Sequence, residues 1–353
     1  MIEKRRGEVF YVTITRLSGW ICDTVASAQQ TFRRLRARFP EDEAAPYAGL
    51  LHSRFPFFAR DRLEAYWMAR FGGERQQRHG AVLVSTQVVE QSVDLDADLM
   101  VSELAPTDIL LQRLGRLWRH EISGRPVERP EAILIEEAAS LEELRQGDPD
   151  AIKRAFGSKG AVYSPYVLLR ALEVWSARRE IAIPGEIRRV MADTYSYRDE
   201  AESWAVLRDE DEGERLGQDD MALFNTDVWR TTLDDGEPQN LPTRLSERRE
   251  YTLALVKEWR RADATANVLE GGLPAQLSGD KNFAALKRLS RCAVRIPETR
   301  ISVAGYRQTK NVLHGVVDGL LLVGDEGELN PGPGVEALKT PMRWDPELGV
   351  VFE

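Results

Sequence analysis

The sequence predicts an α/β protein, in which a doubly wound parallel sheet is followed by a helical extension and a small mixed α+β domain. Three observations predict this class. Short apolar runs alternate with amphipathic helical segments over residues 17–140, as they do in strand-helix units. Residues 141–248 are rich in charge and in helix formers, and residues 249–353 hold strand-like runs between glycine and proline turns. Residues 1–16 are expected to be a lead-in to the first domain.

The first domain is expected to contain five strands. They are predicted at residues 19–22, 47–51, 81–85, 99–101 and 132–135. The strand at 81–85 is apolar on both faces, as a parallel strand covered by helices on both sides must be. A helix capped by Asp23 or Thr24 should follow the first strand, another is predicted over 57–71, and a third runs from Leu110 to Trp118.

Fewer elements are predicted in the rest of the chain. An amphipathic helix is expected over 163–175, and the acidic stretch 208–215 is interpreted as a solvated loop or a helix end. From residue 249 one more helix is expected. Strands should follow it at 291–296, 316–323 and 350–352.

Composition limits the classes of function. The two cysteines, Cys22 and Cys292, are too few for a disulfide framework, and the four histidines form no ligand cluster, so no metal site is expected in this chain. No apolar run approaches the roughly 18 residues of a membrane span, and the N-terminus lacks the apolar core of a secretory signal. A cytoplasmic protein without a membrane partner is therefore expected.

The net charge of −9 is unevenly distributed along the sequence. Residues 1–130 hold 19 basic and 17 acidic side chains, and all but one of the basic ones are arginines. Arginine is suited to bidentate contact with phosphate. A local groove can bind nucleic acid even when the whole chain is acidic.

The first motif that indicates chemistry is QRLGRLWRH at residues 112–120. On a helix, Gln112, Arg116 and Arg119 would lie within about 60° of one another, with Arg113 about 100° away. Such a fork suits the charge of a transferring γ-phosphoryl group: Arg116 and Arg119 would act as arginine fingers, Gln112 would place the attacking water, and Arg113 would be left for an acidic partner. The alternative is a solvated basic helix face with ion pairs along it.

The second motif, STQVVEQSVDLD at residues 85–96, begins where a predicted buried strand ends. Ligands of open α/β sheets bind beyond the carboxyl ends of the strands, so this loop is where a nucleotide or a nucleic-acid strand would be contacted. Thr86 and Gln87 are candidates to donate to a DNA phosphate, and Gln91, Asp94 and Arg113 are candidate nucleotide-associated residues. The alternative is an ordinary loop before a helix capped by Ser92.

Together, the two motifs resemble motifs V and VI of the CRISPR-associated type I effector helicase/nuclease, a superfamily 2 helicase family. LLHSRF at residues 50–55 looks like motif IV of that family, and residues 21–29 are similar to the entry to its second RecA-like domain. One departure is Asp23, where the family usually has Asn. The resemblance covers most of residues 19–200 and implies a second RecA-like domain over 17–140, with a weaker match beyond.

The resemblance implies that His52, Ser53 and Arg54 touch the backbone of a single DNA strand. For His52 the alternative is a core histidine satisfied by a backbone carbonyl. It further implies ATP and Mg²⁺ as cofactors, and as partners single-stranded DNA, an N-terminal helicase/nuclease half and a CRISPR surveillance complex of this antiviral defence.

The 353 residues contain no phosphate loop ending in Gly-Lys followed by Ser or Thr, no DExH box and no His-Asp pair. ATP and Mg²⁺ are therefore expected to be held mainly by an N-terminal half. The chain is expected to be a partial ATP-dependent helicase that hydrolyses ATP only with that half, whether split off or lost. Two alternatives remain: a non-catalytic DNA-binding or docking module that retains the helicase fold, or another superfamily 2 helicase or translocase.

Overall fold

The structure is a computed structural model, and it describes twelve stretches of the chain. They are residues 2–5, 16–39, 47–72, 80–91, 95–122, 124–135, 139–213, 250–260, 265–270, 274–276, 283–303 and 316–353. Two compact units can be distinguished. Residues 1–10, 102–115 and 131–247 form unit 1, and residues 11–101, 116–130 and 248–353 form unit 2.

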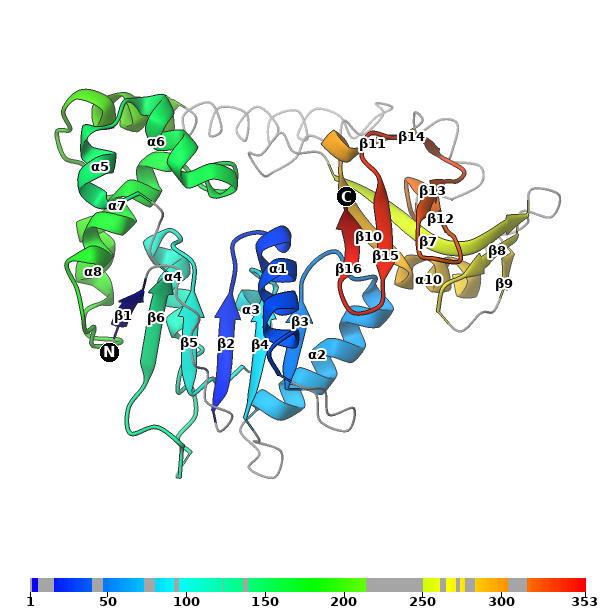
Figure 1. Ribbon diagram of the computed structural model, residues 1–353, viewed down its shortest axis with the longest axis horizontal. Coiled ribbons are helices and arrows are strands. Elements are labelled where there is room, and N and C mark those ends of the chain that lie inside the picture. Colours follow the sequence, from blue (N-terminus) through cyan, green and yellow to red (C-terminus); the bar gives the residue numbers. More distant parts are fainter. Residues whose placement is uncertain are drawn as a thin grey trace, which may run out of the picture. The chain divides into compact units, whose positions relative to one another are not determined.

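Unit 2 is built around neighbouring strands in the order β5-β2-β4-β3. The strands are β2 (Leu17–Ile21), β3 (Ala48–Leu51), β4 (Ala81–Ser85) and β5 (Leu99–Ser102). Strands β2 and β3 both run parallel to β4, and all residues of β4 are buried. Figure 1 shows these strands side by side, which confirms the predicted parallel sheet.

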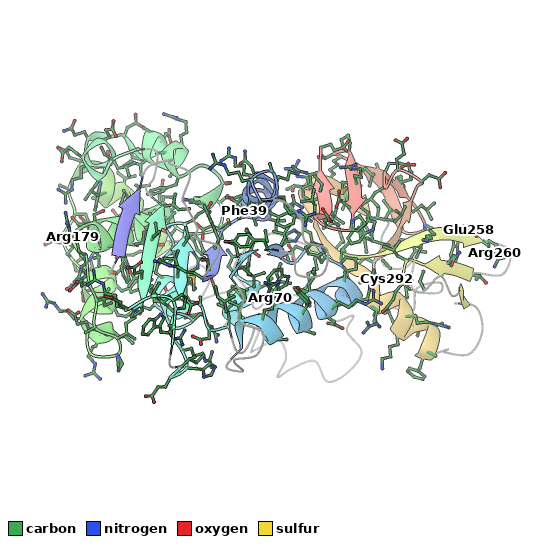
Figure 2. All side chains as sticks on the ribbon, turned by 60° about the horizontal axis from the view of Figure 1, so that its bottom comes forward. Phe39, Arg70, Arg179, Glu258, Arg260 and Cys292 are labelled. Carbon is green, nitrogen blue, oxygen red and sulfur yellow. The ribbon has the colours of Figure 1, made fainter. Side chains whose placement is uncertain are left out.

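Helices α1 (Val25–Arg36), α2 (Phe57–Phe71) and the short α3 (Val88–Gln91) connect these strands. Of the two predicted caps for α1, Thr24 is the one that acts, because its side chain accepts the Ser27 N–H at 3.1 Å. Helix α2 buries Trp67 against Gly49 of β3. A Cβ on Gly49 would lie 2.1 Å from the indole ring, so only glycine fits there. Arg70, marked in Figure 2, lies 5.4 Å from the Trp67 ring centroid.

The C-terminal part of unit 2 is organised by the long strand β7 (Glu250–Arg260). The one helix expected from residue 249 onward does not begin there, because residues 250–260 are a strand; the helix that precedes the predicted strand at 291–296 is α10 (Phe283–Arg291). Leu253 and Leu255 face one apolar cluster while Ala254 and Val256 face another, which is the period of a strand buried on both sides. Strand β7 pairs antiparallel with β8 and β10 and parallel with β12.

The other elements of this part are short. They are β8 (Thr265–Val268), β9 (Pro274–Gln276), α10 (Phe283–Arg291), β10 (Ala293–Pro297), η3 (Glu298–Arg300), β11 (Ile301–Val303), β12 (Gly319–Val323), β13 (Leu329–Pro331), β14 (Val335–Leu338), β15 (Met342–Asp345) and β16 (Gly349–Phe352). Helix α10 packs on the cluster that contains Ala254, and Cys292, marked in Figure 2, lies buried at its end. Strands β15 and β16 form an antiparallel pair, and residues 342–352 are called the C-terminal hairpin below.

Unit 1 contains the parallel pair of β1 (Ile2–Arg5) and β6 (Glu131–Ile135), and several helices. The helices are α4 (Thr107–Leu114), α5 (Leu141–Gln146), α6 (Pro149–Phe156), η2 (Gly157–Lys159), α7 (Pro165–Ser176) and α8 (Ile187–Tyr195), together with residues 202–213. The predicted helix at 163–175 is α7. Residues 208–213 of the acidic stretch continue a helix rather than forming a loop.

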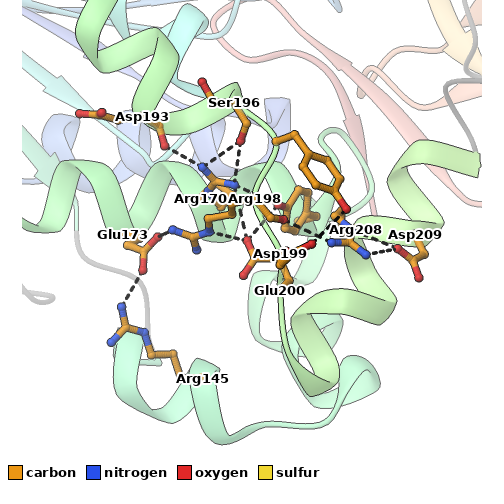
Figure 3. Close-up of polar contacts among 12 residues, drawn as sticks. Arg145, Arg170, Glu173, Asp193, Ser196, Arg198, Asp199, Glu200, Arg208 and Asp209 are labelled. Carbon is orange, nitrogen blue, oxygen red and sulfur yellow. Dashed lines mark hydrogen bonds and ion pairs between the residues drawn. The ribbon is translucent and has the colours of Figure 1, made fainter.

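Two kinds of contact hold the helices of unit 1 together. The buried Trp175 of α7 donates its indole N–H to Thr107 Oγ1 at 3.0 Å, and Thr194 of α8 lies 2.7 Å from the same hydroxyl. Around the buried Arg170, Figure 3 shows a network of charged side chains: Arg170 donates to the Asp193 carbonyl at 2.7 Å and approaches Glu200 at 3.5 Å. The contacts of Thr107 with Trp175 and Thr194 fix the start of α4 to α7 and α8.

In the part of the chain that the structure describes, no helix has both the length and the apolar character needed to cross a membrane.

Candidate functional site

The backbone leaves the helical path in the middle of the QRLGRLWRH motif. Helix α4 ends at Leu114, where the Gly115 N–H bonds to the Leu111 carbonyl at 2.9 Å. Leu117 then forms a β-bridge with Ala97. The prediction that Gln112, Arg116 and Arg119 share one helix face is therefore wrong, because the bridge to Ala97 replaces the next helical turn.

The segment that follows α4, residues 116–120, is called the arginine loop here. The Ala97 N–H donates to the Arg116 carbonyl at 2.9 Å, and the Trp118 N–H donates to the Ala97 carbonyl at 3.0 Å. Trp118 has a φ of 52°, a left-handed conformation that few non-glycine residues adopt. Its ring lies 4.8 Å from the Arg125 guanidinium carbon. The loop is thus held by its backbone against the end of the second motif.

A buried ion cluster lies directly beneath the arginine loop. Arg125 contacts Asp96 at 2.8 Å and Asp98 at 2.9 Å, and the three side chains are at most 3% exposed. The same guanidinium donates to the His120 carbonyl at 2.6 Å, and Asp96 Oδ1 accepts the Arg119 N–H at 2.9 Å. Both ends of the 119–120 segment are therefore fixed to one buried carboxylate-guanidinium pair.

Sequence reasoning missed Asp96 and Arg125. The available signal is the alternation of Asp96 and Asp98 with the apolar residues Leu95, Ala97 and Leu99, all of which are buried. A carboxylate that is buried with its apolar neighbours requires a cation close by. The sequence does not show which of the arginines supplies it, because the ion pair is set by the path of the loop between 118 and 125.

The two proposed arginine fingers differ in their surroundings. Arg116 is partly buried and donates from Nη2 to the carbonyl of Glu90, in α3, at 2.6 Å. Arg119 is exposed, while its backbone is held by Asp96. Gln112 is exposed on the last turn of α4 and belongs to unit 1, whereas Arg116 and Arg119 belong to unit 2.

Arg113 lies in the core of unit 1 and is wholly buried. Its acceptors include the Ser102 hydroxyl at 3.0 Å, the Glu103 carbonyl at 3.3 Å and the Tyr163 hydroxyl at 3.4 Å. These bonds tie α4 to the end of β5 and to the segment before α7. In the structure Arg113 therefore holds α4 in place within unit 1. Its role near a nucleotide stays a prediction.

In the STQVVEQSVDLD motif, the first residues pack against neighbouring strand ends. Thr86 is buried, and its N–H donates to the Leu51 carbonyl at 3.2 Å. Gln87 is partly buried and donates from Nε2 to the Asp23 carbonyl at 3.0 Å. The side chain of Gln91 and the whole of Asp94 lie outside the described residues. Contacts of these four residues with DNA or nucleotide stay predictions.

The structure favours the core-histidine interpretation for His52. The side chain is wholly buried, with Nε2 3.0 Å from the Leu348 carbonyl oxygen. Nδ1 accepts the Arg54 N–H at 3.2 Å, so the neutral ring carries its proton on Nε2 and donates to Leu348. Burial, and then the positive charge of Arg54, lowers the His52 pKa to about 3. The prediction that this side chain touches a DNA strand is therefore corrected.

The C-terminal hairpin covers this histidine. Gln29 of α1 donates from Nε2 to the carbonyls of Leu348, at 2.7 Å, and Val350, at 3.1 Å. The Val350 N–H in turn donates to the Arg54 carbonyl at 3.0 Å. Gly349, with a φ of 71°, allows this approach, because a Cβ there would lie 2.8 Å from the His52 ring. Sequence patterns do not reveal a contact between segments almost 300 residues apart.

Ser53 and Arg54, the two other residues predicted from motif IV, lie nearer to solvent. Ser53 is exposed, and Arg54 is partly buried with its guanidinium carbon 3.9 Å from the Phe352 ring centroid. Burial, and then the charge of Arg300, lowers the pKa of Arg54 to about 10. Within the described stretches, no group of three or more His, Cys, Asp or Glu side chains could hold a metal ion.

Comparison with known proteins matches the chain to one family. The family model described as CRISPR-associated nuclease/helicase Cas3, C-terminal, matches residues 15–122. The CRISPR-associated endonuclease/helicase Cas3 of Thermus thermophilus is 32% identical over 275 residues, which are 70% of this chain and 28% of the relative.

Two solved structures extend the match over almost the whole chain. T. fusca Cas3 with AMPPNP has a TM-score of 0.69 and 25% identity, covering 99% of this chain and 42% of that one. A chain from a structure titled CRISPR RNA-guided surveillance complex, pre-nicking, has a TM-score of 0.66 and 26% identity, covering 95% of this chain and 40% of that one. The chain thus spans less than half the length of these relatives. In sequence and in fold, it corresponds to the C-terminal part of the CRISPR-associated nuclease/helicase Cas3 family.

Proposed function

We propose that this chain is the C-terminal part of an ATP-dependent single-strand DNA translocase of type I CRISPR interference. In this role it supplies Arg116 and Arg119 as arginine fingers to a nucleotide held mainly by an N-terminal half. The observation that carries the proposal is the fixed arginine loop. Its backbone is bonded to Ala97 and to the buried Asp96, so the segment from which both arginine side chains extend is held without help from a helix. Cations held in place before reaction are the ones that stabilise developing charge.

The chemistry proposed for the loop is electrostatic. The charge of a transferring γ-phosphoryl group is spread over three oxygens, and guanidinium groups match it. The exposed Arg119 contacts these oxygens, and Arg116 does so after exchanging its bond to the Glu90 carbonyl for one to phosphate. Gln112 orients the attacking water. Mg²⁺ is assigned to the N-terminal half, since the described residues of this chain offer no metal-binding cluster.

The same proposal assigns DNA contacts to four residues: Ser53, Arg54, Thr86 and Gln87. Ser53 is exposed and Arg54 is partly accessible, which supports contact with a strand backbone. Gln87 reaches a strand by giving up its bond to Asp23, and Thr86, which is buried, offers its hydroxyl only if the loop moves. Gln91 and Asp94 are assigned to the nucleotide side. The structures with AMPPNP and of a surveillance complex are of relatives, and they support ATP and such a complex as partners here.

The test is single-strand-stimulated ATP hydrolysis by the chain alone and by the chain mixed with an N-terminal helicase/nuclease half. Activity is expected only in the mixture. Replacing Arg116 or Arg119 by Ala should lower kcat by about 10³-fold, the lower end of the range for an arginine finger. Arg38→Ala removes an exposed arginine of unit 2 and should leave kcat unchanged.

Arg119→Lys separates geometry from charge. A lysine keeps the charge but lacks the planar fork, so it should restore little of the rate. Activity that survives both alanine substitutions would refute the finger assignment. No activity with any N-terminal half would favour the other class of function, a docking module that retains the helicase fold without turnover.

A further inference from the structure

Two arginines from distant parts of unit 2 meet on one aromatic ring. The guanidinium carbon of Arg54 lies 3.9 Å from the Phe352 ring centroid, and that of Arg300 lies 5.1 Å from it. Arg54 follows β3, Arg300 ends η3, and Phe352 is the last residue of β16. A flat ring that contacts both cations restricts the orientation of both forks.

The charge at this place is not balanced by hydrogen bonds. Among the described residues, the Arg54 guanidinium has no hydrogen-bond acceptor: the residue's hydrogen bonds are made by its backbone, to His52 and Val350. Arg300 donates to Thr340 Oγ1 at 3.1 Å. Glu250 favours the charged form of Arg54, while burial and Arg300 disfavour it and together lower its pKa to about 10. The Arg54 guanidinium is partly accessible and has no protein acceptor among the described residues, so its fork is open to an anionic partner.

We propose that Arg54 and Arg300, held on Phe352, form a binding site for the backbone phosphate of single-stranded nucleic acid. Phosphate accepts two parallel hydrogen bonds from a guanidinium fork, and it would offset the mutual repulsion of the two cations. The contact is to phosphate rather than to a stacked base, because the Phe352 ring already carries a guanidinium at 3.9 Å and a second at 5.1 Å. The identification of the ligand as a nucleic-acid strand rests on the proposed function.

This site extends strand binding beyond the helicase motifs. Arg54 belongs to motif IV, but Arg300 and Phe352 come from the C-terminal part of the chain, where no sequence motif indicates a nucleic-acid contact. Because the C-terminal hairpin also bonds to the Arg54 backbone, the two arginines are held in one folded unit. A strand that binds both cations is therefore contacted from both parts of unit 2.

The experiment measures binding of a fluorescently labelled oligothymidylate of about 16 nucleotides by anisotropy, over a range of salt concentrations. Arg300→Gln should weaken binding about tenfold and reduce the slope of log affinity against log salt by about 0.7 for each phosphate that the variant no longer binds. The matched control is Arg295→Gln, which removes an exposed arginine of β10 and the same charge. Thermal melts verify that the variants are folded.

A second comparison asks whether the two arginines act together. If they bind the same stretch of backbone, Arg54→Gln with Arg300→Gln should cost less than the sum of the single changes in log affinity. Arg300→Lys should restore the salt slope but only part of the affinity. Equal binding by Arg300→Gln and Arg295→Gln, in affinity and in slope, would overturn the proposal.

A last arm distinguishes a strand from a free anion. Inorganic phosphate is added at the ionic strength of a chloride control. Suppose that phosphate stabilises the wild type, and that Arg300→Gln abolishes this stabilisation but leaves oligonucleotide binding unchanged. The site would then bind free phosphate, and this result would overturn the nucleic-acid assignment. Arg300 takes no part in the proposed ATP chemistry, so a failure here differs from a failure of the proposed function, which is scored by the effect of Arg116→Ala on ATP hydrolysis.

Discussion

Substituting Arg125 by Met should destabilise unit 2 strongly, because it removes the cation that pairs with two buried carboxylates. Methionine keeps most of the length of the side chain and removes the guanidinium. The substitution removes the ion pairs with Asp96 and Asp98, at 2.8 and 2.9 Å, and the bond to the His120 carbonyl at 2.6 Å. The carboxylates are 0% and 2% exposed, so water does not replace the cation without a rearrangement of the loop.

The expected magnitude follows from the burial of the cluster. Removing one partner of a buried ion pair costs about 3–5 kcal/mol. Urea unfolding measures this cost as a lower transition midpoint with an unchanged slope. Asp98→Asn is the informative comparison: Arg125 stays paired with Asp96 in that variant, so its destabilisation should be clearly smaller.

The same substitution should release the arginine loop. Asp96 holds the Arg119 N–H, and Arg125 holds the His120 carbonyl, so both anchors depend on this cluster. Tryptic cleavage after Arg116 and Arg119 under native conditions should therefore be faster in Arg125→Met than in wild type. An Arg125→Met protein that stays within about 0.5 kcal/mol of wild type, with unchanged cleavage at the loop, would refute the reasoning.

Three further predictions concern other contacts. Because the folded pKa of His52 is about 3, below its ordinary 6.5, its contribution to stability is complete above pH 6.5 and should fall by about 1.4 kcal/mol per pH unit between 6.5 and 3. In urea titrations at several pH values, His52→Gln should lack this component; an equal pH dependence in both proteins would contradict it. Gly349→Ala should cost about 1–3 kcal/mol in the same assay, from its φ of 71° and the crowded Cβ, and a neutral result would argue against the hairpin contact. Trp175→Phe, which removes the N–H bonded to Thr107, should cost about 1–2 kcal/mol, and a smaller cost in a Thr107→Val background would show that the bond is responsible.

Local patterns were sufficient where one signal dominated. The apolar run at 81–85 forms a strand with the predicted bounds, and the helix predicted at 57–71 also has its predicted bounds. Each element is determined by its own local sequence. The helix predicted from Leu110 to Trp118 ends early because Leu117 bridges to Ala97, which no local pattern shows. Residues 250–260 form a strand where a helix was expected, and their residues alternate between two apolar clusters that only the folded chain brings together.

The candidate site divides in the same way. The two motifs made Arg116 and Arg119 candidates through sequence spacing and family resemblance, and their role as arginine fingers stays a prediction. The contacts that hold the candidate residues in place could not be predicted from the sequence. Arg125 pairs with Asp96 across a loop, and His52 bonds to the carbonyl of the distant Leu348. Both contacts depend on tertiary structure, and the periodicity of a single element does not report them. The residue limits predicted for the separate domains stay predictions.

The docking of the C-terminal hairpin also has a consequence for the order of folding during synthesis. Most of unit 1 lies between residues 102 and 247, so its internal contacts can form before the rest of the chain is made. Unit 2 is different, since Gln29 and His52 emerge from the ribosome long before Leu348 and Val350. For that interval Nε2 of His52 and the side-chain amide of Gln29 lack the hairpin carbonyls to which they donate. Unit 2 therefore lacks these contacts until the C-terminal hairpin has been translated, and a ribosome stalled before residue 348 would carry unit 2 without them.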